Sequence, residues 1–195
     1  MKLTILSLLF LLFSCEEESI PKKTIIDYSN QIEKIKTFAK QNNYNQKIVF
    51  MIDYSLHSGL QRFFVVDLQK NKIIKKALVC HGSCKGENNS DYSKVFSNTN
   101  DSYCTSLGFA LITERAYSKW GKNYKYWLEG LEKSNSNMKN RVVVLHAWEG
   151  VPDKSIYPKS LATSWGCPTV SINFLDELDS ILKKEKKILL YSFKQ

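Results

Sequence analysis

Two short stretches decide the fold and the chemistry of this sequence: Val142-Val143-Val144-Leu145-His146 and, after seventeen further residues, Ser164-Trp165-Gly166-Cys167. The apolar run before the histidine is typical of a buried strand, which would hold the imidazole rigidly. Gly166 allows unusual backbone dihedrals, and Pro168 removes a backbone donor just after the cysteine. We therefore expect Cys167 at a junction between elements, where functional groups are commonly held.

These two side chains have the chemistry of a thiol nucleophile with its general base. A cysteine is mostly protonated near neutral pH, and an imidazole can take that proton and stabilise the thiolate. Cys167 as nucleophile and His146 as base predict acyl transfer through a thioester. The alternatives are structural, since unpaired cysteine is often a small buried hydrophobe and a histidine at a strand end is often a packed polar residue.

Length and composition favour a single globular domain after a short leader. The chain has 195 residues, 43% of them hydrophobic, and domains commonly span roughly 100–200 residues. Residues 1–14 carry a positive start at Lys2 and an apolar run from Leu3 to Phe13. That run is shorter than the ~20 apolar residues that a membrane-spanning helix needs. It predicts a secretory signal peptide.

Cys15 follows this run at a position that resembles the cleavage site of bacterial lipoproteins, although Phe13 replaces the small residue usual there. The resemblance implies that Cys15 becomes the lipid-carrying N-terminus. Residues 15–27 are then a charged tether and residues 28–195 the domain. An uncleaved N-terminal anchor is the alternative. In both cases we expect an exported protein held in the bacterial cell envelope, at the periplasmic or surface face of the outer membrane.

Basic residues are scattered along the chain. The formal net charge is +9, or +8 without residues 1–14, and the only arginines are Arg62, Arg115 and Arg141. Proteins that bind nucleic acids usually gather their basic residues on one face or in a recognisable motif. We therefore expect no nucleic-acid partner, and an anionic envelope polymer or membrane surface suits this charge better.

The cysteines besides Cys15 are Cys80, Cys84, Cys104 and Cys167. The first three can form one bridge and leave one bystander, or they can all stay reduced. Together with His81 and His146 these cysteines include the residue types that bind zinc, but their spacing matches no familiar pattern of zinc ligands. We expect neither a metal nor a cofactor.

Hydrophobic periodicity predicts a β-rich domain with a helix near each end. Helices are expected over 29–43, with Ser29 as the N-cap, and over 173–184. Strands are expected over 47–54, 62–68, 72–80, 107–113, 124–131, 141–147 and 188–193, the second and third forming a hairpin. The polar segment 82–101 is expected to be a loop, and a loop of this length in a compact domain usually has a function.

The spacing between His146 and Ser164-Trp165-Gly166-Cys167 resembles the active-site motif of the L,D-transpeptidases of bacterial cell walls, the YkuD-like family. Ser106-Leu107-Gly108-Phe109 resembles the strand before the catalytic segment, and His81-Gly82 with Phe96-Ser97-Asn98 resembles a branch common among exported proteins. The resemblance covers about Ile48 to Phe193. It implies a mostly antiparallel β-sandwich with an N-terminal helix and a helix after the catalytic cysteine, with Cys167 as nucleophile and His146 as base.

The residues around the nucleophile also receive expected roles. Ser164 would hydrogen-bond the imidazole or order the thiolate loop, as the family resemblance favours. Backbone N–H groups around Trp165 and Gly166 would stabilise an oxyanion. Two positions depart from the family: many members have histidine where Trp165 stands, and Arg or Asn, which helps to hold a substrate carboxylate, where Thr169 stands.

Three further residues are assigned to substrate binding. His81 and Gly82 are included because His81 would compensate for the missing second histidine, with capping of a strand as the structural alternative. Trp148 is included because aromatic side chains can line a groove for a glycan or a peptide, a role that Trp165 would share. His57, in a turn, is expected to be a solvated loop residue.

The resemblance implies an enzyme that acts on peptidoglycan stem peptides. Cys167 would attack the carbonyl of the third stem residue, the following D-residue would leave, and the thioester would pass to an acceptor. An amine acceptor gives a cross-link or an anchored protein, and water gives a carboxypeptidase. A thiol peptidase of wall peptides and a non-catalytic peptidoglycan-binding lipoprotein are the alternatives. We expect a monomer.

Overall fold

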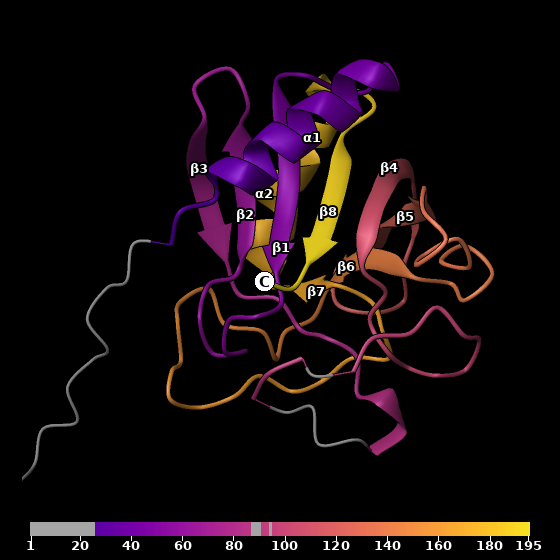
Figure 1. The fold of residues 1–195 in the computed structure, drawn as a ribbon. Helices are drawn as coiled ribbons and strands as arrows, with labels where there is room; N and C mark the ends of the chain where they lie inside the picture. The colour runs from indigo at the N-terminus through magenta and orange to yellow at the C-terminus, as the bar shows by residue number, and fades with distance from the viewer. Residues whose placement is uncertain (1–25, 87–90, 94) are drawn as a thin grey trace, which may run out of the picture.

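The computed structural model describes residues 26–86, 91–93 and 95–195, so the predicted signal peptide, Cys15 and most of the predicted tether lie outside the described residues. The described part contains two helices, a short 3-10 turn and eight strands (Figure 1). In chain order these are α1 (Ser29–Gln41), β1 (Ile48–Asp53), β2 (Phe63–Asp67), β3 (Lys72–Ala77), η1 (Cys84–Gly86), β4 (Gly108–Tyr117), β5 (Tyr124–Gly130), β6 (Val144–Ala147), β7 (Thr169–Val170), α2 (Ile172–Lys184) and β8 (Leu189–Phe193).

The described strands form one sheet in the order β3-β2-β1-β8-β4-β5-β6-β7. Neighbours are antiparallel except for the pairs β1–β8 and β6–β7. The predicted hairpin is confirmed as β2–β3. At the far edge, His146 of β6 pairs in register with Thr169 of β7. This parallel pair brings together the two stretches that are far apart in the sequence.

The sheet has a hydrophobic core on each face. Helix α1 packs on one face through Ile35 and Ala39, and α2 packs on the other, where Figure 1 shows it behind the strands. Phe174, Leu175 and Leu178 of α2 pack in a core with residues from both ends of the sheet, namely Phe50, Phe63, Ala77, Leu128, Leu145, Ala147 and Val170. The sheet therefore curls around α2, and the expected sandwich is realised as one curled sheet. The predicted fold class is confirmed.

Two details of the predicted elements are wrong for local backbone reasons. Ser29 is the first helical residue and not the N-cap, because Tyr28 holds that position and the carboxylate of Asp27 accepts the Ser29 backbone N–H at 2.9 Å. Strand β6 begins at Val144 and not at Arg141, because Val142 has φ +57°, which no strand accommodates. Neither described helix is long and apolar enough to cross a membrane.

The polar segment after β3 is fastened to the motif that contains Cys167. A disulfide joins Cys84 to Cys104, whereas Cys80 is a free, buried thiol, which is the first of the two arrangements considered from the sequence. The backbone N–H of Ser164 donates to the carbonyl of His81 at 2.7 Å, and Ser83 donates to the carbonyl of Ser164 at 2.9 Å. This segment therefore forms one wall of the candidate site.

Candidate active site

The side chains predicted to react lie on the outer face of the edge strands β6 and β7. Leu145 and Ala147 of β6 and Val170 of β7 point into the core around α2. Because side chains alternate along a strand, His146 and Thr169 point to the opposite face. The register of β5 and β6 places Lys125 opposite His146 on that same face. The sheet thus gathers a base, a hydroxyl and a cation at one edge.

Cys167 precedes β7 and is half-buried. Its sulfur accepts the backbone N–H of Val144 at 3.4 Å and lies 3.7 Å from the carbonyl of Val142, to which the thiol donates. Burial raises the pKa of the Cys167 thiol, while the Val144 N–H and the charges of Arg141 and Lys125 act to lower it. The net direction is upward, so the resting side chain is a protonated thiol with stabilising groups already beside it.

Each nitrogen of the His146 imidazole makes one polar contact. Nδ1 lies 3.1 Å from the carbonyl of Ala147, which can only accept, so Nδ1 carries the proton. Nε2 is then the basic nitrogen, and it lies 3.0 Å from the hydroxyl of Thr169. Burial lowers the pKa of His146, the carbonyl of Ala147 raises it and the ammonium of Lys125 lowers it. The net shift is downward, which keeps this histidine neutral and ready to accept a proton.

The described contacts include no direct hydrogen bond between Cys167 and His146. Thr169 connects them instead, because its hydroxyl lies 3.0 Å from Nε2 of His146 and 3.3 Å from the carbonyl of Cys167. The thiol is turned toward the start of β6. Thr169, which the sequence analysis treated only as a departure from the family, therefore links the predicted base to the backbone of the predicted nucleophile.

The turn before Cys167 is built by Ser164 and Gly166. The Ser164 hydroxyl donates to the carbonyl of Cys167 at 2.7 Å and accepts the Gly166 N–H at 3.2 Å. Of its two expected contacts, Ser164 makes the one that orders the loop. Gly166 has φ +102°, and a Cβ there would meet the carbonyl of Cys104 at 2.7 Å, so the turn requires glycine.

This geometry changes the expected set of oxyanion donors. The N–H of Gly166 is already donated to Ser164, which leaves it poorly suited to that role. Within the described residues, the backbone N–H groups of Trp165 and Cys167 make no hydrogen bond. Unengaged backbone N–H groups close to a nucleophile in the sequence are candidates for stabilising an oxyanion in acyl transfer.

Arg141 is a site residue that the sequence analysis missed. Its guanidinium donates to the carbonyls of Ser97 and Cys104, at 2.8 Å and 2.6 Å, and to the hydroxyls of Ser102 and Ser106, at 3.2 Å and 2.6 Å. It forms no ion pair within the described residues, and its charge helps to lower the pKa of Cys167. The scarcity of arginine in this lysine-rich chain is the signal that could have found it, because only arginine offers a rigid fork of five donors.

His81 and Gly82 are buried behind the site, so the direct substrate contact expected for them does not fit their positions. Nδ1 of His81 accepts from the buried guanidinium of Arg62 at 2.6 Å. Burial, reinforced by the Arg62 charge, lowers the pKa of His81 to about 3. A Cβ on Gly82 would meet the carbonyl of Tyr103 at 2.2 Å. These residues support Ser164 through the His81 carbonyl and do not face the solvent.

Trp148 is exposed, whereas His57 is buried. Trp148 follows β6 directly, is 40% exposed and donates its backbone N–H to Val170 at 3.0 Å, so its position suits a substrate contact. His57 is buried and not solvated, because its ring packs edge-on against Tyr92 and Tyr157 and accepts the Gly59 N–H at 3.0 Å. The expectation for His57 was wrong since two aromatic residues distant in the sequence cover the turn.

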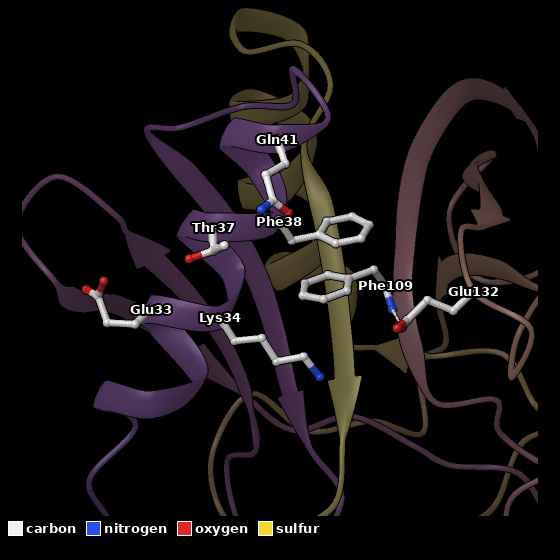
Figure 2. A pocket seen from close by; sticks show the side chains of 7 residues that line it. All are labelled: Glu33, Lys34, Thr37, Phe38, Gln41, Phe109 and Glu132. Atoms are coloured by element: carbon white, nitrogen blue, oxygen red, sulfur yellow. Dashed lines mark hydrogen bonds between the residues drawn. The ribbon is translucent and has the colours of Figure 1, made fainter.

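A hollow of about 390 Å³ lies elsewhere, between α1 and β4, and none of the predicted site residues lines it. Figure 2 shows the ring of Phe38 stacked on that of Phe109, with Lys34 and Glu132 beside them. Glu132 is occupied by the backbone N–H of Phe109 at 2.6 Å, and Lys34 by the hydroxyl of Tyr191 at 2.9 Å. Its polar groups are thus used to join α1 and β4 to the rest of the fold.

Comparison with solved structures finds similar folds at low sequence identity. The helical cell shape determining protein Pgp2 of Campylobacter jejuni, in a single-residue variant, aligns with a TM-score of 0.47 and 11% identity over 78% of this chain and 49% of its own. An L,D-transpeptidase of Xylanimonas cellulosilytica aligns with a TM-score of 0.43 and 12% identity over 80% of this chain and 68% of its own. This chain thus spans about half the length of the Pgp2 chain. A search of curated proteins finds no match.

The family model gives a more specific result. Residues 17–191 match the YkuD_2 family, described as the L,D-transpeptidase catalytic domain. The match contains strands β1 to β7, the first residues of β8 and both stretches with which the sequence analysis began. The chain therefore belongs to the L,D-transpeptidase catalytic domain family.

Proposed function

We propose that this chain is a cysteine L,D-transpeptidase that acts on peptidoglycan stem peptides. The observation that carries the proposal is the edge formed by β6 and β7, where the half-buried thiol of Cys167 accepts the Val144 N–H at 3.4 Å and a neutral histidine pairs in register with Thr169, two residues after that thiol. Membership of the family supports the reaction type.

In the first half-reaction, rotation of the Cys167 side chain away from Val142 lets its proton pass to Nε2 of His146. The sulfur then attacks the carbonyl carbon of the third stem residue, and the N–H groups of Trp165 and Cys167 donate hydrogen bonds to the oxyanion. Collapse breaks the C–N bond to the D-residue, which leaves as an amine with the proton that His146 returns. The product on the enzyme is a thioester.

In the second half-reaction an acceptor attacks the thioester carbonyl and gives its proton to His146, and the thiol leaves. A side-chain amine of another stem yields a cross-link, and water yields a trimmed stem. Trp148 would line the path of the substrate from the His146 side, since it follows β6 at the surface. The proposal includes export and lipidation at Cys15, which would keep the domain beside the cell wall.

Incubation of the protein with purified muropeptides, read by mass spectrometry, tests the activity. We expect new cross-linked or exchanged stems, and their loss in Cys167→Ala by about a thousandfold or more. Cys80→Ala is the matched control, because Cys80 is the other free thiol among the described residues and is buried. If Cys167→Ala turned over muropeptides as fast as the parent, the nucleophile assignment would be wrong.

A non-catalytic peptidoglycan-binding role is the second candidate, and one observation favours it: the resting thiol contacts Val142 and not the imidazole. Under that role the same incubation would leave the muropeptides unchanged while the protein bound them. Under the thiol peptidase alternative it would yield trimmed stems and no cross-links.

A further inference from the structure

An exposed pair of aromatic rings lies beside the turn that carries Cys167. The ring of Trp165 stacks on that of Tyr103, with centroids 5.5 Å apart and planes at 23°. Trp165 is 74% exposed and Tyr103 37% exposed. The ammonium of Lys85 lies 5.3 Å from the centre of the Tyr103 ring. Exposed aromatic surface of this kind usually marks a binding site rather than part of a core.

The pair is held in place by the same contacts that shape the site. The Cys84–Cys104 disulfide ties the segment of Lys85 to the segment of Tyr103. Arg141 binds both neighbours of Tyr103 through the Ser102 hydroxyl and the Cys104 carbonyl. The rings therefore form a preorganised surface, so a ligand that stacks on it orders few side chains.

The distance from the nucleophile fits the geometry of the proposed substrate. Trp165 is two residues before Cys167, so their Cα atoms are at most about 7.6 Å apart. The first three residues of a stem peptide span about 10 Å when extended. With the third residue at the sulfur of Cys167, the sugar that bears the stem can therefore reach the two rings.

We propose that Trp165 and Tyr103 form a subsite for the glycan strand of peptidoglycan, a role that rests on the proposed function. A pyranose ring presents C–H groups on its flat face, which pack on aromatic rings, and its oxygen atoms lie around its edge. The exposed face of the Trp165–Tyr103 pair receives the sugar, and the ammonium of Lys85 at its border binds sugar oxygens. This subsite selects stems that are attached to glycan over free stem peptides.

Binding of tetra-N-acetylglucosamine, which has no stem peptide, to the full chain tests the subsite. We expect it to shift the NMR signal of the Trp165 indole N–H, and Trp165→Ala to weaken its binding about five- to tenfold. Trp165→Phe should restore part of the affinity. Tyr117→Ala is the matched control, because Tyr117 is equally exposed at 74% but lies at the end of β4 without a stacked partner among the described residues.

Each result distinguishes this subsite from the proposed activity. Unchanged tetrasaccharide affinity in Trp165→Ala, or binding only of free stem peptide at these rings, would overturn the glycan subsite and leave the transpeptidase proposal standing. The activity proposal would fail alone if the tetrasaccharide bound as expected while Cys167→Ala retained full turnover. As a second measurement, Trp165→Ala should lower the preference for glycan-linked stems over free stems by about the same five- to tenfold.

Discussion

At the scale of single residues, the protonation states of Cys167 and His146 determine how the proposed reaction starts. Burial raises the pKa of the thiol and lowers that of the imidazole. Between these two values both groups are neutral, so the resting pair is a thiol and an imidazole and not an ion pair. We expect alkylation of Cys167 by iodoacetamide to keep accelerating with rising pH to about pH 9 and beyond, without a plateau near neutrality.

Site-specific mass spectrometry would give this pH profile for Cys167 alone, with Cys80 as an internal control. The Cys80 thiol is buried, which raises its pKa to about 12, and it should not react in the folded protein. Turnover should begin to fall only below about pH 6.5, because the lowered pKa of His146 keeps this base neutral at higher pH. A pH-independent alkylation rate between about pH 5 and pH 8 would instead indicate a thiolate–imidazolium pair.

Thr169 is the second residue-scale test, because its hydroxyl donates to Nε2 of His146 and so favours the neutral imidazole. Thr169→Val should raise the pKa of His146 by up to about one unit, the equivalent of one hydrogen bond. The acidic limb of activity should move to higher pH by the same amount. NMR titration of the His146 ring protons measures this pKa. Thr169→Ser keeps the hydroxyl and should therefore keep the pKa of the parent. The same pKa in parent and valine variant would mean that the hydroxyl only packs there.

At the scale of elements, Arg141 links the site to the loop between η1 and β4. Its four contacts hold the loop while its charge acts on the thiol. Arg141→Lys keeps the positive charge but loses the planar guanidinium that makes the four hydrogen bonds, whereas Arg141→Gln loses both. We expect each variant to lower the free energy of unfolding by about 2–3 kcal/mol in urea denaturation. Only the glutamine variant should also raise the pKa of Cys167, seen as slower alkylation at fixed pH.

Lys139→Gln is the control for this pair, since Lys139 is exposed and makes no described ion pair. This variant should change neither the free energy of unfolding nor the pKa of Cys167. Equal alkylation rates in the lysine and glutamine variants of Arg141 would show that its charge does not reach the sulfur.

The elements also show what the sequence predicted and what it did not. Alternating and helical periodicity identified α1, α2 and the strands other than β7, because burial on one face leaves a regular pattern that the two residues of β7 are too few to show. The start of β6 was missed because periodicity continues through Val142, whose positive φ comes from the turn before it. The burial of His57 and the fork of Arg141 depend on partners 35 or more residues away, which no local pattern records.

At the scale of the whole molecule, the same strand pairing builds the sheet and the candidate site. The parallel pairing of β6 with β7 is both the edge of the sheet and the reason that His146 approaches the Cys167 segment. Recognition of the motif therefore predicted the nucleophile and the base together. It could not give Thr169 its role, because that role depends on the register of the pair and not on the spacing.

The remaining whole-molecule prediction concerns where the protein is held. If Cys15 carries the lipid, about ten residues at ~3.3 Å each would keep the domain within ~30 Å of the bilayer. Cells grown with labelled palmitate should incorporate label into the parent protein, which should sediment with membranes, whereas Cys15→Ala should lose the label. With an uncleaved N-terminal anchor, Cys15→Ala would still sediment with membranes and the parent would carry no label. Tethering would limit the stem peptides within reach to those near the membrane. A soluble form that begins after residue 27 should therefore cross-link isolated cell walls as well as the parent does. In cells, it should be less selective for stem peptides near the membrane.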